Sequence, residues 1–517
     1  MDNQAVISVG FAPLTVEDVV VVARGGALIE VSQAALDRVR ATRSVIEALA
    51  NDTVPHYGVS TGFGALATRH IPVELRAQLQ SSLVRSHAAG AGPEVEREVV
   101  RALMLLRIQT LATGRTGIRE QTLTTYAALL NAGIVPVVHE YGSLGCSGDL
   151  APLAHCALAL MGEGTVRDKD GHLGDAATVL AAAGITPVSL AEKEGLALIN
   201  GTDGMLGMLC LAIHDLRQLV RTADISAAMS VEGLLGSDDV FAADLQALRP
   251  QPGQARSASN MRRVLANSPI RDSHRDKATD IKVQDAYSLR CAPQVAGAVR
   301  DTIDHAERVA GWELASAVDN PVVTLDGRVE SNGNFHGAPV AYVLDFLAIA
   351  AADLASISER RTDRFLDKAR NHGLPPFLAD DPGVDSGLMI AQYTAAGLVS
   401  EMKRLAVPAS VDSIPSSAMQ EDHVSMGWSA ARKLRRSIDA LAHVVAIELI
   451  TAARGIELRM PLEPAPATAA VIAALNEAGN TRPGPDRWLA PDLQAAYEAV
   501  LDGLPVRAAE GATGPLA

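Results

Sequence analysis

The sequence predicts an all-α protein: a bundle of long helices preceded by an N-terminal domain that is mixed but mainly helical. Hydrophobic residues make up 48% of the chain and aromatic residues only 3%, so the core is built from Ala, Leu and Val. That composition favours packed helices over a sandwich or a barrel. Beyond residue 200, apolar residues recur every three or four positions over long stretches, as in amphipathic helices. The 517 residues are enough for two or three structural units.

Residues 1–199 and 200–517 are expected to form separate domains. The first range mixes short helical patterns with glycine-rich turns. The second contains three segments with helical periodicity that are long enough for a bundle, over 341–370, 386–405 and 427–459. We expect the polar, basic segment 250–284 to leave the bundle. The segment 461–485 is rich in Ala and Pro, and the C-terminal tail after it is expected to be loosely tied.

Charge and composition also restrict partners and location. A net charge of −15 argues against nucleic acids and anionic membranes as partners. We find no uncharged apolar run of about 20 residues, the length that spans a bilayer. The start, Met-Asp-Asn-Gln, lacks the basic and apolar regions of a secretory signal. The four cysteines have no metal-type spacing and suggest a reducing compartment. The sequence therefore predicts a cytoplasmic protein without membrane or nucleic-acid partners.

The most informative segment is 142–155, which reads Gly-Ser-Leu-Gly-Cys-Ser-Gly-Asp-Leu-Ala-Pro-Leu-Ala-His. The amide nitrogen of Gly148 can attack the carbonyl of Cys146, and Ser147 can then lose its hydroxyl as water. The product is a five-membered methylidene-imidazolone, an electrophile made from protein alone. Gly148 permits the compressed backbone that this needs. Asp149 is expected to cap a helix over 150–161, whose positive end would stabilise electron density on the ring. An isolated tripeptide of this kind is more often a plain turn before a core helix.

Two further clusters could carry chemistry. Tyr57 opens the glycine-rich run 57–64, which suits a mobile loop tip with a catalytic phenol, although a structural tyrosine in a turn is the alternative. Tyr287 and Arg290 are three residues apart and share a face if they are helical. A guanidinium is the natural partner of a substrate carboxylate, whereas a plain surface arginine is the alternative.

Two more candidates lie further along the chain. Phe335 sits in an expected tight turn over 333–337, where it can face an aromatic substrate or tuck into the core. Glu421 begins an acidic run just before a long helix. An acidic group there can also serve the helix dipole, so helix capping is the alternative to a catalytic role.

Taken together and in this order, these segments resemble a family of ammonia-lyases and aminomutases that use methylidene-imidazolone (MIO), and among them the histidine ammonia-lyases. Most members begin the tripeptide with Ala, and Cys146 should be harmless because only its carbonyl takes part. Members acting on phenylalanine or tyrosine usually carry Phe-Leu or His-Leu in place of Ser86-His87, and Gln in place of Glu421. Asn is common where this chain has Met419. The resemblance covers most of the chain and rests on residues 57–64, 85–90, 142–155, 197–202, 287–290, 333–336 and 420–423.

The resemblance implies elimination of ammonia from L-histidine to give trans-urocanate, the first step of histidine degradation. It also implies MIO formed autocatalytically from Cys146, Ser147 and Gly148 without an external cofactor, and a homotetramer with each site built from three subunits. Tyr57 would remove the β-proton, which requires its pKa to fall from about 10. By the same resemblance, the catalytic residues are Tyr57, Ser147, Glu421 and Tyr287, of which Tyr287 assists proton transfer. Arg290 would bind the substrate carboxylate, His87 and Glu421 the imidazole, and Phe335 would pack against the ring. The other substrate-binding residues are Asn200 and Gln284.

Three alternatives remain open. A tyrosine or phenylalanine ammonia-lyase or 2,3-aminomutase would use the same electrophile, and Glu421 is the residue that separates it from a histidine enzyme. A metal-dependent lyase is less well supported, because His139-Glu140 lacks the second histidine of a zinc helix. A helical binding protein without activity is the third alternative, and the intact set of tripeptide, tyrosine, arginine and glutamate argues against it.

Overall fold

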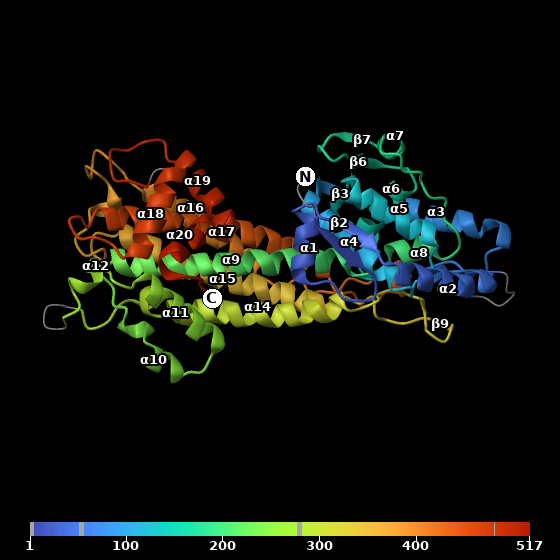
Figure 1. The fold of residues 1–517 in the computed structure, drawn as a ribbon, viewed down its shortest axis with the longest axis horizontal. Helices are drawn as coiled ribbons and strands as arrows, with labels where there is room; N and C mark the ends of the chain where they lie inside the picture. Colours follow the sequence, from blue (N-terminus) through green and yellow to red (C-terminus); the bar gives the residue numbers. More distant parts are fainter. Residues whose placement is uncertain (1–4, 51–55, 277–281, 480) are drawn as a thin grey trace. The chain divides into compact units, whose positions relative to one another are not determined.

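The computed structural model describes residues 5–50, 56–276, 282–479 and 481–517, and within them the chain is mainly helical with a few short strands (Figure 1). The predicted all-α class is confirmed. The chain forms two compact units. Unit 1 comprises Met1–His214, Ala306–Asp345 and Pro408–Arg432, and unit 2 comprises Asp215–His305, Phe346–Val407 and Lys433–Ala517. The expected separate domains over 1–199 and 200–517 stay a prediction.

Helices and short paired strands make up unit 1. Its helices pack around α4, which is buried from Val99 to Ala112. Strand β1 pairs with β2 in parallel, whereas the pairs β3–β5, β4–β6, β6–β7 and β8–β9 are antiparallel. The elements wholly in unit 1 are β1 (Val6–Val9), α1 (Val16–Ala23), β2 (Leu28–Val31), α2 (Gln33–Ala50), η1 (Gly64–Leu66), η2 (Val73–Leu75), α3 (Arg76–His87), β3 (Ala91–Glu94), α4 (Arg97–Ala112), α5 (Glu120–Asn131), β4 (Val135–Pro136), β5 (His139–Tyr141), α6 (Leu150–Leu160), β6 (Thr165–Arg167), β7 (Leu173–Asp175), α7 (Ala176–Ala182), α8 (Glu194–Ile199), β8 (Val322–Val323), β9 (Val329–Glu330) and η5 (Ser417–Met419).

Four long helices contribute residues to both units: α9 (Asp203–Gly233), α14 (Ala292–Leu314), α15 (Ala338–Leu366) and α17 (Gly427–Glu457). Their bounds confirm the long helices expected over 341–370 and 427–459, and α16 confirms the one over 386–405. The elements wholly in unit 2 are η3 (Asp239–Phe241), α10 (Ala243–Ala247), α11 (Pro252–Val264), α12 (Pro269–Asp272), α13 (Tyr287–Arg290), η4 (Pro376–Leu378), α16 (Met389–Leu405), α18 (Pro466–Ala478), α19 (Ala490–Leu501) and α20 (Leu504–Thr513).

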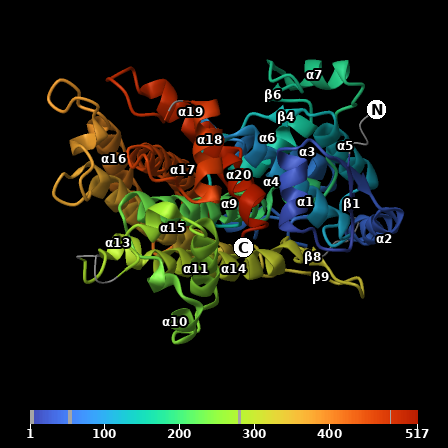
Figure 2. The ribbon, with the colours of Figure 1, turned by 60° about the vertical axis from the view of Figure 1, so that its left-hand side comes forward.

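Helices α9, α15 and α17 lie side by side in unit 2 (Figures 1 and 2), and a buried carboxylate connects them there. Glu448 of α17 accepts hydrogen bonds from Ser226 and Ser230 of α9, at 3.0 and 2.7 Å. It also accepts from Ser358 of α15 at 2.6 Å and forms an ion pair with Arg361. Such a charge is tolerated in a core only when it is fully paired and hydrogen-bonded, so these contacts fix which helix faces meet.

Helix α15 is also long and apolar enough to cross a membrane by length and composition, and 61% of its most apolar stretch is buried in the structure. A core helix passes the same test. The observation therefore fits the burial of α15 among other helices and carries no conclusion about membranes.

Two expectations about irregular segments are wrong. Part of the segment 250–284 is the packed helix α11, in which a Cβ added to Gly253 would lie 2.2 Å from the carbonyl oxygen of Gly297 on α14. Two glycines in backbone contact let a polar helix pack closely, which hydrophobic periodicity does not reveal; residues 277–281 of the segment lie outside the described residues. The C-terminal tail is not loosely tied, because Leu516 is 5% exposed and the amide of Ala517 donates to Asn260 Oδ1 at 3.0 Å.

Candidate active site

A cavity of about 700 Å³ in unit 1 brings together five of the predicted site residues, Tyr57, His87, Ser147, Asn200 and Glu421. They come from five separate segments: the turn after α2, the last residue of α3, the turn before α6, the residue after α8 and the residues after η5. The rest of the lining is largely apolar, as in most small-molecule sites. Several lining residues that no motif marks were not predicted from the sequence, among them Leu79, Leu83, Leu196, Asn320, Ser417 and Ala418.

The tripeptide forms a compressed turn at the wall of this cavity. Gly148 has a φ of 75°, and a Cβ there would lie 2.0 Å from the carbonyl oxygen of Gly201. The backbones of residues 146 and 148 form a bridge with each other, and the amide of Asp149 donates to Gly201 O at 2.8 Å. Only glycine fits at 148, and the bridge brings the backbones of residues 146 and 148 together. The residues present therefore fit the MIO group.

The side chain of Cys146 is partly buried and free of any disulfide. Burial, together with the negative charge of Glu421, raises the pKa of this thiol to about 12. The thiol is therefore protonated at neutral pH and is not a nucleophile there. This agrees with a role for Cys146 that involves its carbonyl alone.

The expectation that Asp149 caps its own helix is wrong. Asp149 occupies the N-cap position of α6, yet its side chain makes no bond to that helix. Instead Oδ2 accepts from the amide of Met205, in the first turn of α9, at 2.9 Å, and Oδ1 accepts from Ser143 at 3.1 Å. The carboxylate thus binds the start of α9 to the tripeptide turn, and burial raises its pKa to about 7.

Tyr57 lies in a turn that packs against the segment carrying Glu421. Its Oη accepts a hydrogen bond from the amide of Gly64 at 3.4 Å, and its ring meets that of Phe63 edge to face. Burial raises the pKa of Tyr57, and the charge of Glu421 acts in the same direction, whereas the Gly64 amide lowers it. A catalytic base requires the pKa to fall, so within the described residues the shift is opposite to the expected one. A positive charge beside the phenol is needed to reverse it.

His87 and Glu421 give the cavity a polar region. The Nδ1 atom of His87 lies 2.9 Å from the carbonyl oxygen of Leu83, which can only accept, so Nδ1 carries the proton in this contact. Burial lowers the pKa of His87, and the neutral ring then keeps Nε2 as an acceptor. Glu421 is held by Ser416, whose hydroxyl donates to Oε2 at 2.7 Å. Helix capping by Glu421 is ruled out as its role, because α17 begins at Gly427 with no acidic residue in its first turn.

Asn200 is 2% exposed and contributes an unused acceptor. Its Nδ2 donates to the backbone carbonyl oxygen of Asn320 at 2.9 Å. Its backbone carbonyl oxygen accepts from Arg107 at 2.7 Å. The Oδ1 atom has no hydrogen-bond partner within the described part of the chain. A buried acceptor without a partner costs free energy, which a bound donor can recover.

Four of the predicted catalytic and substrate-binding residues do not line this cavity. Tyr287 and Arg290 form α13 in unit 2, where the guanidinium carbon lies 4.7 Å from the tyrosine ring centre, so their expected common face is confirmed. Gln284 precedes them in the same unit, and both it and Tyr287 are exposed. Phe335 lies half-buried in unit 1, in the expected turn but outside the cavity lining.

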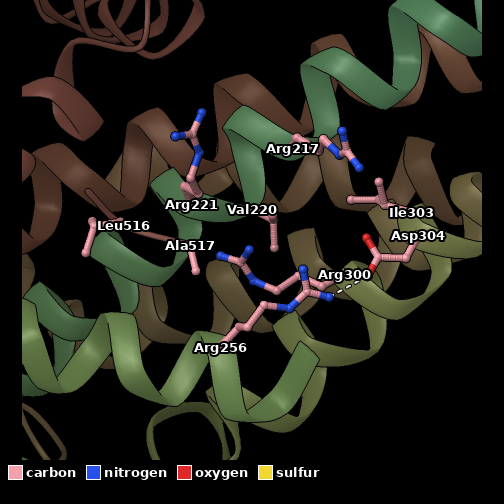
Figure 3. A pocket seen from close by; sticks show the side chains of 9 residues that line it. All are labelled: Arg217, Val220, Arg221, Arg256, Arg300, Ile303, Asp304, Leu516 and Ala517. Carbon is pink, nitrogen blue, oxygen red and sulfur yellow. Dashed lines mark hydrogen bonds and ion pairs between the residues drawn. The ribbon is translucent and has the colours of Figure 1, made fainter. Parts of the chain in front are cut away.

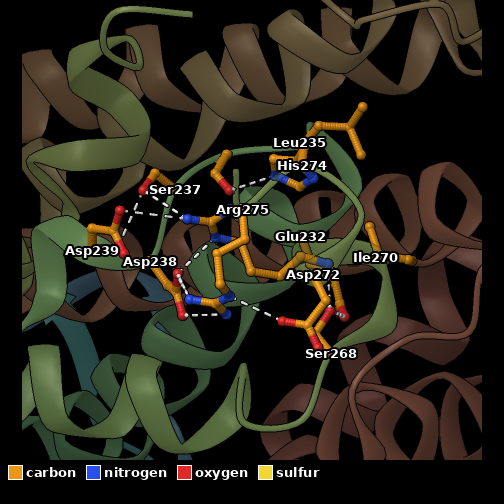
Figure 4. A network of polar contacts seen from close by, with 12 residues as sticks. Glu232, Leu235, Ser237, Asp238, Asp239, Ser268, Ile270, Asp272, His274 and Arg275 are labelled. Carbon is orange, nitrogen blue, oxygen red and sulfur yellow. Dashed lines mark hydrogen bonds and ion pairs between the residues drawn. The ribbon is translucent and has the colours of Figure 1, made fainter. Parts of the chain in front are cut away.

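Figure 4 shows a polar network in unit 2 around Ser237, Asp238 and Arg275, and the segment that carries Gln284, Tyr287 and Arg290 is bound to it through Asp285. The amide of Ser237, just after α9, donates to Asp285 at 2.6 Å. Arg271 and Arg275 both bind Asp238, at 2.6 and 3.2 Å. The sequence analysis missed this network, because its acidic and basic partners come from separate segments and follow no motif.

A second cavity, of about 250 Å³, is lined by four arginines of unit 2 (Figure 3). Arg300 forms an ion pair with Asp224 at 2.6 Å, and Arg256 binds Asp304. Arg221 lies 3.8 Å from Glu510. Carboxylates of the same unit thus already engage these guanidinium groups, and none of the predicted site residues lines this cavity.

Comparisons with known proteins show the family of the chain. A family model described as aromatic amino acid lyase matches residues 14–477. Curated relatives named histidine ammonia-lyase include one from Streptomyces avermitilis and one from Streptomyces griseus, each 68% identical over 99% of both chains. Among solved structures, a tyrosine aminomutase from Streptomyces globisporus has a TM-score of 0.93 at 38% identity and covers 99% of this chain and 100% of its own. A histidine ammonia-lyase from Trypanosoma cruzi has a TM-score of 0.89 at 37% identity, with coverage of 98% and 96%. The chain therefore belongs to the aromatic amino acid lyase family.

Proposed function

We propose that this protein eliminates ammonia from L-histidine to give trans-urocanate, the first step of histidine degradation. The observation that carries the proposal is the single cavity that gathers Tyr57, His87, Ser147, Asn200 and Glu421. The fold alone does not select the substrate, because a tyrosine aminomutase and a histidine ammonia-lyase are both close structural neighbours. Support for histidine comes from relatives at 68% identity that carry the name histidine ammonia-lyase.

The polar region of the cavity suits an imidazole ring. A neutral imidazole carries one N–H donor and one acceptor nitrogen. The Nε2 acceptor of His87 and the carboxylate of Glu421 can each accept that N–H, and a protonated ring would be stabilised by Glu421. A phenyl ring offers no hydrogen bond to either group, so it would displace water from these polar atoms without replacing the lost hydrogen bonds, which is costly. We therefore assign substrate choice to His87 and Glu421.

We further propose that Cys146, Ser147 and Gly148 cyclise with loss of two waters to form MIO, and that no external cofactor is used. The compressed turn supports this, since glycine is required at 148 by both its φ and its contact with Gly201. Once formed, the group supplies an electrophile that makes the amino group a better leaving group. Helices α6 and α9 both begin beside the turn, and the positive ends of their dipoles favour negative charge there.

The remaining residues bind the substrate or move a proton. Tyr57 takes the β-proton, and the amide of Gly64 is in place to stabilise the phenolate oxygen. The unpartnered Oδ1 of Asn200 accepts from the substrate amino group. Arg290 of another chain in the proposed tetramer binds the carboxylate, and its positive charge would lower the pKa of the phenol. Gln284 hydrogen-bonds nearby, Tyr287 assists proton transfer, and Phe335 packs against the ring.

We propose a homotetramer in the cytoplasm, with no nucleic-acid or membrane partner. An apolar groove of about 500 Å³ runs along the unit 2 parts of α14 and α15. In it, Phe346 and Ile349 are 46% and 47% exposed in the single chain. Exposed apolar surface of this kind is typical of interfaces, and a second copy of the chain is the occupant that the proposed assembly supplies.

The test is turnover of L-histidine, L-tyrosine and L-phenylalanine by the purified chain, read from product absorbance, together with its intact mass. We expect rapid formation of urocanate and a mass two waters below the encoded one. Glu421→Gln should lower histidine turnover by about 10²–10⁴-fold, the usual contribution of a general acid or base. The matched control is Asp422→Asn, an exposed neighbour, which should leave the rate within about twofold.

Two variants separate the electrophile from the rest of the site. Ser147→Ala cannot lose the hydroxyl water and should be almost inactive, whereas Cys146→Ala should still show the full mass deficit because its carbonyl is unchanged. Active wild type at the encoded mass would refute the MIO assignment. Tyrosine turnover as fast as histidine turnover would refute the substrate assignment and favour a tyrosine lyase or aminomutase.

A further inference from the structure

Unit 1 contains a third cavity, of about 640 Å³, that shares no lining residue with the catalytic cavity. It lies where α1 and α5 end and α4 begins. Four cationic side chains line it, Arg24, Arg97, Arg101 and Lys169, together with the acidic Glu96 and Glu98.

Arg101 is the buried member of this group, at 5% exposure. Its Nε and Nη2 donate to the carbonyl oxygen of Val22, at 3.1 and 2.8 Å, and its Nη1 donates to Leu130 O at 3.1 Å. These carbonyls belong to the last turns of α1 and α5, so Arg101 satisfies the C-terminal ends of two helices. Burial and the like charge of Arg97 lower the pKa of Arg101 to about 10, which still leaves it charged at neutral pH.

Arg97 and Lys169 stand close together at the exposed side of the cavity. Arg97 donates to the carbonyl oxygens of Asp168 and Gly133, at 3.2 and 2.9 Å. A Cβ added to Gly133 would lie 3.2 Å from Lys169 Cβ and 3.3 Å from Arg97 Nη2, so both side chains start or end beside this glycine. Within the described ranges, no carboxylate lies within 4.0 Å of the charged nitrogens of Arg97, Arg101 or Lys169.

The acidic residues that line the cavity pair with other arginines. Glu98 pairs with Arg24 at 2.5 Å, and Glu96 pairs with Arg432. The two helix ends at Arg101 contribute a negative charge equivalent to about one half each. Arg97 and Lys169 are therefore left without a directly bound carboxylate among the described residues. The arginine cavity of unit 2 differs, because carboxylates bind its guanidinium groups.

Donors also remain for a ligand. A guanidinium has five N–H groups, and Arg101 uses three of them on carbonyls while Arg97 uses two. The ammonium of Lys169 adds three more. Two forked guanidinium groups beside an ammonium suit a phosphate, which carries a charge of about −1.5 to −2 at pH 7 when it is a monoester.

We propose that this cavity, lined by Arg97, Arg101 and Lys169, is a binding site for a small phosphate monoester, separate from the catalytic cavity. The proposal does not depend on the substrate of the enzyme. It explains why a protein with a net charge of −15 keeps three cations together without carboxylate partners.

The test is isothermal titration of the full-length protein with glycerol 3-phosphate at low ionic strength, with glycerol as the uncharged control. We expect binding of glycerol 3-phosphate and none of glycerol. Arg97→Gln and Lys169→Gln change exposed side chains, so folding should survive, and each should weaken binding by about tenfold or more. Arg101 is left intact because its loss would leave two helix ends unsatisfied.

The matched control is Arg328→Gln, another exposed arginine of unit 1, which pairs with Asp326 and Glu330. It should bind as the wild type does, and histidine turnover without the phosphate should be unchanged in all three variants. Absence of binding to the wild type would overturn the proposal. Binding by Arg97→Gln and Lys169→Gln as tight as that of the wild type would overturn it too. Binding lost in His87→Gln instead would place the phosphate in the catalytic cavity and overturn it equally.

Discussion

Gly148 is glycine for two reasons that the structure separates: its φ of 75° and its approach to the carbonyl of Gly201. The sequence analysis reached the same residue from cyclisation chemistry, because that chemistry involves only neighbours in the chain. Asp149 was predicted wrongly for the complementary reason. Its partner, Met205, lies far along the sequence, and a capping pattern reports only on residues within one helical turn. Residue roles set by local covalent chemistry could be predicted, and those set by distant partners could not.

Asp149 leads to a prediction about stability and pH. Its pKa rises from 3.8 to about 7 in the folded chain, so between about pH 4 and 7 the folded state binds a proton that the unfolded state has released. The favourable contribution of protonated Asp149 is therefore complete below about pH 4 and is lost as pH rises through about 7. A shift of this size corresponds to stability on the order of 4 kcal/mol.

We expect Asp149→Asn to remove this slope, because asparagine does not titrate. Melting temperatures of wild type and variant, compared at pH 5 and pH 8, give the measurement. The wild type should lose more stability than the variant on going to pH 8. If the melting temperature changed equally in the two proteins between pH 5 and pH 8, the assignment of the raised pKa to Asp149 would be contradicted.

At the scale of elements, the long helices α15, α16 and α17 were predictable because hydrophobic periodicity is a local signal repeated over many turns. Helix α11 was not, because its buried face mixes polar residues and Gly253, in contact with Gly297, with only a short apolar stripe of Ala258, Met261 and Val264. The same limit applies to η5, where Ser417, Ala418 and Met419 all have positive φ values of 49–70°. No local pattern predicts three such residues in a row.

The η5 conformation gives a reason why Asn suits position 419. Met419 has a φ of 70° and is 67% exposed, so its side chain gains little packing to offset the backbone cost. Asparagine tolerates the left-handed region far better than methionine. Met419→Asn should therefore raise the melting temperature by roughly 1–3 °C. Met419→Ala is the control, since alanine keeps the same backbone cost and should give no gain; an equal gain from both would refute the explanation.

At the scale of the whole molecule, the predicted site divides between the two units. Tyr57, His87, Ser147, Asn200 and Glu421 share one cavity of unit 1. The remaining Gln284, Tyr287 and Arg290 belong to unit 2, and Phe335 lies in unit 1 outside the cavity. The sequence analysis grouped all of them only through resemblance to a family, because residue patterns do not report which surfaces of different chains meet.

The proposed tetramer offers a way to complete the site, and it gives the last prediction. If Ser147 and Arg290 of one site come from different chains, Ser147→Ala and Arg290→Ala should each be inactive alone. Co-expressed, they should regain a measurable fraction of activity, because some sites in mixed tetramers receive wild-type Ser147 from one chain and wild-type Arg290 from another. Differently tagged chains, purified through both tags, verify the mixing. Activity at background in such tetramers would mean that each site is built within one chain, and a monomer in light scattering that still makes urocanate would refute the assembly itself.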